Sequence, residues 1–353
     1  MASRNRIPVA ILGATGAVGQ RFVQLLADHP WFELAALAAS ERSAGRAYGE
    51  ACKWVIPGDP PSHIGDHLVR ALVPDLPARI VFSAVPADVA REIEPQFAQH
   101  GYLVCSNASA FRNVADVPLL IPELNADHLA MIERQREQRG WSGLLVTSPN
   151  CTITGVAMAL KPLDDAFGVR KVFMTSMQAL SGAGYPGVSA LDITDNVIPY
   201  IAGEEEKFQQ ELQKLLGHVS EGTLMPADLV VSAHANRVPV LDGHTVSLSV
   251  GFEQHPTPDE AIDVLRAYRP APAAIGLPSS PVHLIRVRTE PDRPQPRRDR
   301  DAEGGMGLSV GRIRPCPILD LRMTTVIHNT LRGAASGAIL NAELLVAAGY
   351  AEV

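Results

Sequence analysis

The first third of the sequence alternates short apolar runs with helical patterns, and this alternation constrains the fold more than any other feature. The run VAILG is followed by AVGQRFVQLLADH, whose apolar positions recur at helical spacing, and further apolar runs follow at FELAALAAS, RIVFSAV and YLVCSN. Repeated strand–helix–strand units predict a parallel sheet, because parallel neighbours need a long crossover that a helix usually supplies. We therefore expect an α/β chain with a Rossmann-like parallel sheet in its N-terminal part.

The pattern changes after Val146. A strand and a turn open an apolar helix, and strand-like runs follow at KVFMTSMQAL, ANRVPVLDGHTVSLSVGF and VHLIRVR. These runs predict a second α+β domain built on a mixed or antiparallel sheet. The segment from His328 onward predicts an amphipathic helix that packs back on the first domain. We therefore divide the chain into one domain of residues 1–150 with about 328–353, and a second of residues 151–327.

Composition narrows the class of function. The 353 residues carry a net charge of -7, so no broad positive field is available to attract nucleic acid. No run of about twenty apolar residues could span a membrane, and the start MASRNRIPVAILG lacks a signal-peptide pattern, so we expect a cytoplasmic chain. The four cysteines are scattered without a CxxC pair, which favours free thiols and predicts neither a metal site nor a disulfide framework.

The stretch of residues 290–307 has its own composition. It is rich in proline, glycine and charge. Such a composition predicts an exposed loop with little order of its own, which moves or touches a partner subunit.

A glycine-rich turn lies between the first strand and the first helix, with its glycines spaced as GxxGxxG rather than GxGxxG. Glycines here allow a tight turn and close approach of the backbone to a pyrophosphate, whose charge then meets the amides and dipole of the helix N-terminus. Because a strand precedes and a helix follows, nucleotide binding is favoured over a purely structural turn. The residues expected to contact the cofactor are Gly13, Ala14, Thr15, Gly16, Ala17 and Val18.

The residues after the second strand decide which dinucleotide fits best. An NAD enzyme presents a carboxylate to the ribose 2'-hydroxyl at this point, and Glu41 could play that part. Arg42, with Ser40 and Ser43 on either side, is a better cradle for a 2'-phosphate, because guanidinium and hydroxyl donors suit a dianion. The sequence therefore favours NADP over NAD.

Cys151 is the candidate nucleophile. It lies in SPNCTITG, a polar turn that leads into an apolar helix, and a helix N-terminus is expected to lower the pKa of a thiol. The alternative, a small buried core residue, fits Cys105 in its apolar strand better. Asn150 and the amide of Cys151 could hold the oxyanion that forms when a thiolate adds to a carbonyl.

His244 is the candidate proton carrier. Arg237 precedes it by seven residues (244 − 237 = 7), and VPVLDGHTVS predicts a hairpin that turns at Asp242 and Gly243. Such a hairpin would bring both side chains to one pocket, where Arg237 would anchor a substrate carboxylate while His244 moves protons. The alternative for Arg237 is a structural salt bridge.

Several motifs carry a resemblance that spans nearly the whole chain. The segments GATGAVGQ, SPNCT, MQALSGAGYPG, GEEEK, NRVPVLDGHT and HNTLRGAA, in that order, resemble aspartate-semialdehyde dehydrogenases of the branch shared by archaea, fungi and some bacteria. The resemblance implies an NADP-binding first domain and a second domain for catalysis and dimerisation, in a homodimer or homotetramer without a metal.

The resemblance also implies roles for single residues. Cys151 would accept the acyl group, His244 would act as acid and base, and Gln178 would orient the substrate. The substrate carboxylate would bind Arg237, and the substrate amino group would bind Glu204. The substrate phosphate would bind Lys207 and Arg112. Without the resemblance, the acidic run at residues 204–206 and Lys207 would be interpreted as a solvated helix face. Further cofactor contacts implied in this way are Ser83, Gly182 and Asn329.

The reaction implied is reduction of L-aspartyl 4-phosphate by NADPH to aspartate 4-semialdehyde and phosphate through a Cys151 thioester, a step in lysine, threonine, methionine and isoleucine biosynthesis. Malonyl-CoA reductases and N-acetyl-glutamyl-phosphate reductases are the alternatives with similar chemistry. Malonyl-CoA reductases replace the asparagine before the cysteine and lack the acidic cluster, whereas this chain keeps Asn150 and GEEEK. The substrate of N-acetyl-glutamyl-phosphate reductases has no free ammonium group for Glu204 to bind. A cysteine acyl-hydrolase would leave the glycine turn unused, and a non-catalytic NADP sensor would leave Cys151 unused.

Overall fold

The computed structural model describes residues 6–352 and contains two six-stranded sheets and one two-stranded hairpin. The first sheet is parallel throughout, in the order β3-β2-β1-β4-β5-β6. Its strands are β1 (Ile7–Leu12), β2 (Phe32–Ala38), β3 (Val69–Arg70), β4 (Ile80–Ser83), β5 (Leu103–Ser106) and β6 (Leu144–Thr147). The predicted Rossmann-like parallel sheet is confirmed.

Helices cover both faces of the first sheet, as a parallel sheet requires. Side chains of α1 and α11 pack on one face, and those of α3 pack on the other. The helices of the whole chain are α1 (Ala17–Leu26), α2 (Tyr48–Ala51), α3 (Ala87–Gln99), α4 (Pro122–Asn125), α5 (Met131–Arg139), α6 (Cys151–Phe167), α7 (Ala190–Ile193), α8 (Glu205–Leu216), α9 (Pro258–Ala267), α10 (Pro296–Asp299) and α11 (Ser336–Ala347).

The second sheet is mixed, in the order β10-β7-β11-β14-β13-β12. Its central strands are antiparallel, whereas β10 runs parallel to β7 and β12 runs parallel to β13. Its strands are β7 (Val169–Gln178), β10 (Val230–Arg237), β11 (His244–Phe252), β12 (Ile285–Arg288), β13 (Leu308–Pro315) and β14 (Leu321–Ile327), and the hairpin is β8 (His218–Ser220) with β9 (Thr223–Met225). The predicted mixed sheet is confirmed.

Helices α6, α8 and α9 cover one face of the second sheet, whereas on the other face the short α10 packs beside β13 and β14 and leaves the side chains of β7 and β10 exposed. Apolar side chains of α6, α8 and α9 form one core with Val172 and Met174 of β7. Phe173, on the opposite face of the same strand, is 44% exposed, and Val230 of β10 is 62% exposed. The second domain therefore presents an uncovered apolar sheet face.

The predicted hairpin between Arg237 and His244 is wrong. Strand β7 lies between β10 and β11 and pairs with both, so these two strands are not neighbours. Residues 238–243 instead form a strap that crosses the end of β7. The strap pairs with the segment after that strand, because Leu180 N donates to Val240 O and Ser181 N to Leu241 O.

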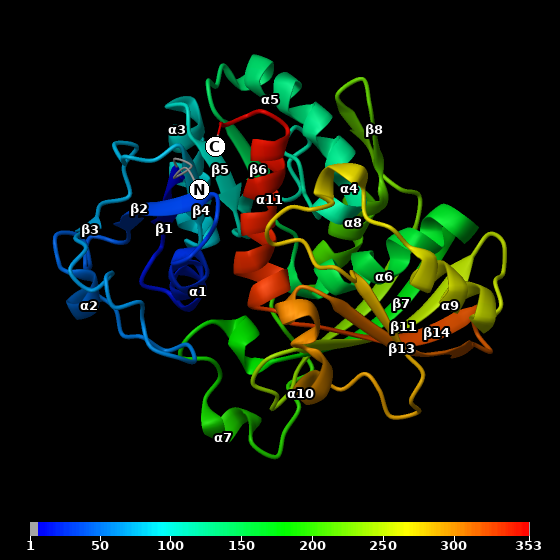
Figure 1. The fold of residues 1–353 in the computed structure, drawn as a ribbon. Helices are drawn as coiled ribbons and strands as arrows, with labels where there is room; N and C mark the ends of the chain where they lie inside the picture. The colour runs from blue at the N-terminus through cyan, green and yellow to red at the C-terminus, as the bar shows by residue number, and fades with distance from the viewer. Residues whose placement is uncertain (1–5, 353) are drawn as a thin grey trace.

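The C-terminal segment runs from β14 through a π-helical turn, Leu331–Ala335, into α11. Figure 1 shows α11, in red, between the first sheet and the second domain. It packs on the first domain as expected, but the amphipathic pattern is wrong, because both sides of the helix are buried. Its polar side chains are paired inside the protein, Glu343 with His29 and Ser279, and Asn341 with Ser148.

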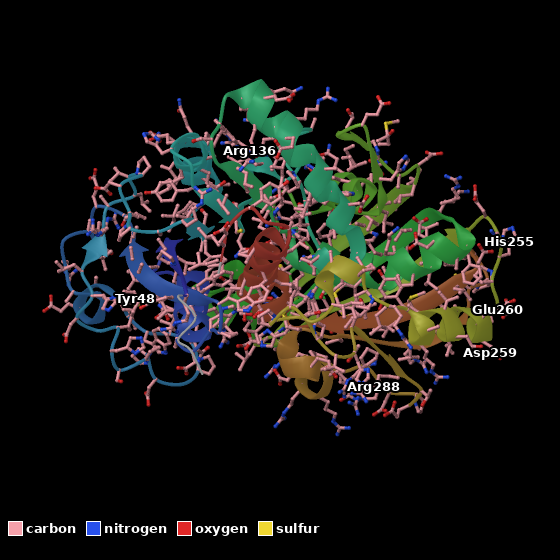
Figure 2. All side chains as sticks on the ribbon, turned by 45° about the horizontal axis from the view of Figure 1, so that its top comes forward. Tyr48, Arg136, His255, Asp259, Glu260 and Arg288 are labelled. Atoms are coloured by element: carbon pink, nitrogen blue, oxygen red, sulfur yellow. The ribbon has the colours of Figure 1, made fainter. Side chains whose placement is uncertain are left out.

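The expectation of an unordered loop at residues 290–307 is also wrong. The segment contains α10 and a 3-10 turn at Ala302–Gly305. The buried carboxylate of Asp299 binds Arg293 and Arg288, at 2.5 and 2.7 Å, and accepts a bond from Gln295 N. Figure 2 shows Arg288 close to α10. Paired charges therefore order a segment whose composition alone predicts a solvated loop.

Within residues 6–352, no helix is long and apolar enough to cross a membrane. The same residues contain no group of histidine, cysteine and acidic side chains arranged to hold a metal ion.

Candidate active site at the seam between the two sheets

Cys151 is the first residue of α6, directly after the turn that leaves β6. Asn150 caps the helix, since its side-chain oxygen accepts hydrogen bonds from Thr152 N at 2.8 Å and Ile153 N at 3.4 Å. The C-terminal π-turn packs against the same point, because a Cβ on Gly333 would lie 2.7 Å from Cys151 Cβ. The candidate nucleophile therefore lies where both domains and the C-terminal segment meet.

His244 faces this thiol across the seam. Its Nε2 lies 3.1 Å from Cys151 Sγ, and its Nδ1 accepts a hydrogen bond from Ala179 N at 3.0 Å. Because an amide can only donate, the neutral ring carries its proton on Nε2, pointing at the sulfur. A doubly protonated ring would direct a second N–H at the Ala179 amide.

The electrostatics of this pair contradict the expectation of a lowered thiol pKa. Burial, together with the negative charge of Glu204, raises the pKa of Cys151 to about 12 although Arg112 and Arg237 oppose this shift. Burial, with the positive charges of Arg237 and His328, lowers the pKa of His244 to about 3. The backbone amide of Thr152, in the first turn of α6, also lowers the thiol pKa, but burial outweighs it. The resting pair is therefore a neutral thiol and a neutral imidazole.

Gln178, Arg237 and His244 meet at one edge of the second sheet. Arg237 is paired with Gln178 in the ladder between β10 and β7, and His244 begins β11 on the other side of β7. Arg237 Nη1 donates to Ala179 O at 2.7 Å. A Cβ on Gly182 would lie 2.8 Å from both Arg237 Nη1 and His244 Cε1. The structure thus brings both predicted side chains to one pocket, by a topology different from the expected hairpin.

Glu204 is connected to the same pocket. Its carboxylate accepts from Asn150 Nδ2 at 2.8 Å and from Gln178 Nε2 at 3.3 Å. Lys207 lies one turn further along α8, and the described residues place no carboxylate within ion-pair distance of its ammonium. The acidic run is therefore partly inside the site, and only Glu206 of this run is exposed to solvent.

Arg112 reaches the site from the first domain. Its Nη2 donates to Asn107 O at 2.8 Å, and its Nη1 lies 3.4 Å from Glu211 Oε1. The side chain of Asn107 and Nε of Arg112 are buried and have no hydrogen-bond partner among the described residues. These polar atoms mark a place where a ligand would supply the missing bonds.

Glu211 and Lys214 of α8 were not predicted, although the sequence contains a signal for them. Glu204, Lys207, Glu211 and Lys214 are spaced by three, four and three residues, which places them on one face of a helix. Glu211 is fully buried and Lys214 is 4% exposed, so this face is turned toward the protein.

The glycine turn has the geometry that a dinucleotide requires. Gly13 has a φ of +82°, and a Cβ there would lie 2.7 Å from Ala84 O. A Cβ on Gly19 would lie 2.2 Å from Gly13 O, so α1 can begin directly against the turn. Behind the turn, the hydroxyl of the buried Tyr48, labelled in Figure 2, donates to Ala14 O.

The other predicted cofactor residues lie along the same edge of the first sheet or in the seam. Ser83 ends β4 and its buried hydroxyl has no partner among the described residues, whereas Ser40 and Arg42 follow β2 and are exposed. Asn329 is held by the protein itself, since it accepts from Gly243 N and donates to Ser181 Oγ. The free hydroxyl, the close glycine turn and the α1 N-terminus together fit a nicotinamide dinucleotide.

Comparison with known proteins identifies two matching family descriptions. "Semialdehyde dehydrogenase, NAD binding domain" matches residues 8–132, and "Semialdehyde dehydrogenase, dimerisation domain" matches residues 160–332. The chain belongs to the semialdehyde dehydrogenase family.

Named relatives of this family member are found in archaea and fungi. An aspartate-semialdehyde dehydrogenase of Archaeoglobus fulgidus is 52% identical, over 97% of this chain and 98% of the relative. That of Schizosaccharomyces pombe is 47% identical, over 97% and 98%. A crystal structure of aspartate-semialdehyde dehydrogenase with NADP from Candida albicans has a TM-score of 0.90 at 42% identity, over 97% and 99%.

Proposed function

We propose that this chain is an aspartate-semialdehyde dehydrogenase, which reduces L-aspartyl 4-phosphate with NADPH to L-aspartate 4-semialdehyde and phosphate in the biosynthesis of lysine, threonine, methionine and isoleucine. The observation that carries the proposal is the pair formed by the partly buried Cys151 and the buried His244, 3.1 Å apart, with Arg237, Glu204 and Arg112 around it. Each of these charges has a partner on the substrate: the α-carboxylate for Arg237, the ammonium for Glu204 and the phosphate for Arg112 with Lys207.

The first half-reaction forms a thioester. Cys151 Sγ bonds to the acyl carbon, the bond from that carbon to the phosphate oxygen breaks, and the thiol proton leaves with the phosphate as hydrogen phosphate. Asn150 and Gln178 bind Glu204 in the absence of substrate, so both amides lie beside the place where the acyl group is held. Arg112 and Lys207 would bind the departing phosphate.

The second half-reaction reduces the thioester. When bound, NADPH supplies the hydride to the thioester carbon, and its pyrophosphate would lie on the turn of residues 13–18. The Nε2–H of His244 would donate a hydrogen bond to the oxyanion and then to the departing thiolate, and a proton taken up from solvent would restore the thiol. Gly182 leaves room beside His244 and Arg237, and its neighbours would shield the thioester from water.

We assign the cofactor to residues 1–150 with about 328–353, and catalysis and dimerisation to residues 151–327. Packing of α11 on the first sheet supports the division. The uncovered sheet face with Phe173 and Val230 supports a homodimer through the second domain. Light scattering should give a dimer, and Phe173→Lys should weaken it while Val282→Lys, at another exposed position, should not. A tetramer that Phe173→Lys leaves intact would contradict this interface.

We also place the enzyme in the cytoplasm, because a thiol nucleophile needs a reducing compartment and the cysteines at positions 52, 105, 151 and 316 are all free. Recovery of activity in a membrane or periplasmic fraction would contradict this assignment.

The decisive experiment follows the reverse reaction by NADPH absorbance, with aspartate semialdehyde, phosphate and NADP. We expect NADPH formation that requires phosphate and is abolished in Cys151→Ser, because a hydroxyl is a far poorer nucleophile near neutral pH. Phosphate-independent acid formation would indicate hydrolysis of the thioester. Greater activity with malonate semialdehyde and CoA, or with N-acetyl-glutamate semialdehyde and phosphate, would overturn the substrate while leaving the thioester chemistry.

A further inference from the structure

One face of α8, in the second domain, contacts two parts of the active site: the turn that carries the nucleophile and the loop that carries Arg112. The helix lies beside α6, as Figure 1 shows, and its residue Glu211 is fully buried. One carboxylate oxygen of Glu211 accepts from Asn150 N at 2.6 Å, and the other lies 3.4 Å from Arg112 Nη1. A single buried side chain thus contacts both the nucleophile turn and the arginine that would hold phosphate.

The contact with Asn150 fixes the turn that carries the nucleophile. Asn150 lies between β6 and α6, its side-chain oxygen caps α6, and its side-chain nitrogen binds Glu204. A carboxylate on the backbone amide is a charge-assisted bond, so it holds this turn more firmly than a neutral acceptor would. Movement of the turn would displace the thiol and both hydrogen bonds of the Asn150 side chain.

The contact with Arg112 fixes the direction of the guanidinium. Asn107 O and Glu211 bind its two terminal nitrogens, which leaves the buried Nε without a partner among the described residues. The next turn of α8 holds the backbone of the same loop, because Lys214 Nζ donates to the carbonyls of Arg112, Val114 and Val117 at 2.6–2.8 Å. The loop of the first domain is therefore attached to α8 at two levels.

We propose that Glu211 is a positioning residue that fixes Arg112 and the Cys151 turn relative to each other, so that phosphate is held within reach of the acyl carbon that bonds to the thiol. The inference rests on the proposed function, because it concerns the phosphate subsite of that reaction. Burying this carboxylate is unfavourable, and burial raises the pKa of Glu211 although the Arg112 guanidinium opposes the shift. A costly buried charge that contacts both the nucleophile turn and Arg112 is consistent with a role in alignment.

Two substitutions separate the two contacts. Glu211→Gln keeps an oxygen for Asn150 N but removes the charge beside Arg112, so the KM for phosphate should rise about tenfold while the KM values for NADP and aspartate semialdehyde stay within about twofold. Glu211→Leu removes both contacts, so kcat should fall by about thirtyfold or more as well. Glu206→Gln, an exposed position on the same helix, should change neither constant.

A double mutant tests whether Glu211 acts through Arg112. In an Arg112→Met background, Glu211→Gln should add less than about twofold to the phosphate KM, because the group that it orients is gone. Glu211→Asp keeps the charge on a shorter side chain and should raise the phosphate KM less than Gln does, which provides a second test if either larger change impairs folding. Equal rises in all three KM values, or additive effects with Arg112→Met, would overturn the inference. Absence of phosphate-dependent activity in the unmodified enzyme would instead overturn the proposed function.

Discussion

At the residue scale, the Cys151–His244 pair differs from a preformed thiolate–imidazolium pair. The helix N-terminus alone predicts an acidic thiol, and this prediction is wrong because burial dominates the pKa of a group removed from water. Position on a helix is visible in the sequence, whereas desolvation depends on which distant residues close over the thiol. The tautomer of His244 is likewise set by Ala179 N, sixty-five residues away in sequence.

The pH dependence of thiol alkylation tests this neutral pair. Because the thiol pKa is raised, iodoacetamide should modify Cys151 of the cofactor-free enzyme at a rate that increases about tenfold per pH unit from pH 7 to 9. The measurement needs a Cys316→Ser background, because amide donors including Leu319 outweigh burial and lower the pKa of the Cys316 thiol. A rate that is already constant between about pH 5 and 7 would show an ion pair and contradict the neutral state.

Glu204 is the residue that we propose to bind the amino group of the substrate. Glu204→Gln should weaken binding of aspartate semialdehyde by about 1.5–3 kcal/mol, the scale of a lost charge-assisted hydrogen bond, and leave NADP binding unchanged. Succinate semialdehyde, which lacks the amino group, should be a poor substrate for both proteins. Steady-state constants for both aldehydes on both proteins give the coupling between Glu204 and the amino group. An equal loss of activity with both aldehydes would show that the ammonium binds elsewhere.

At the element scale, the sequence predicts structures whose stabilising contacts are local. The strands of the first sheet and the start of α6 follow from apolar runs, glycines and the Asn150 cap, all within a few residues. The supposed hairpin fails because β7, more than fifty residues earlier, inserts between the two strands. The prediction for the α10 segment fails because a run of charges does not reveal that Asp299 will be buried between Arg288 and Arg293. The α8 face shows that a helical spacing of charges could have identified Glu211.

Asp299 provides a stability test of this element. Burial alone would raise its pKa, but the Arg293 pair and the other donors outweigh burial, and the net pKa is lowered. A lowered folded-state pKa contributes stability above the unfolded pKa that is lost as pH falls. Asp299→Asn should therefore lower the free energy of unfolding by about 2–4 kcal/mol at pH 7.

The difference between Asp299→Asn and the unmodified protein should narrow as pH falls below about 4, where the unfolded carboxyl becomes protonated. Urea titrations at several pH values measure this difference. A difference that is constant from pH 7 to 3 would show that the charge of Asp299 is not what stabilises α10.

At the scale of the whole molecule, a buried ion pair fixes the C-terminal segment to the rest of the first domain. Arg332 of the π-turn binds Glu123 of α4 through two bonds of 2.6 and 2.7 Å, and both side chains are almost fully buried. Arg332→Met would leave the Glu123 carboxylate buried without its cation, so the free energy of unfolding should fall by about 3–5 kcal/mol.

Adding Glu123→Gln should restore part of this loss, because no buried charge then remains unpaired. Arg170→Met, which removes an exposed pair with Glu253, should cost less than about 1 kcal/mol and serves as the control. Unfolding must be compared at one protomer concentration, since association also stabilises the folded chain. A loss from Arg332→Met no larger than that of the control would show that the pair does not fix the C-terminal segment.

The strap of residues 238–243 joins Arg237 to His244 across the end of β7. The number of residues in the strap therefore affects both substrate binding by Arg237 and proton transfer by His244. One inserted residue would shift the register of β11 and turn the face that now carries His244 toward Cys151 to the opposite side. We expect proteins with this fold to tolerate insertions at surface turns such as Glu221–Gly222, between β8 and β9. We expect the strap to have the same length in all of them.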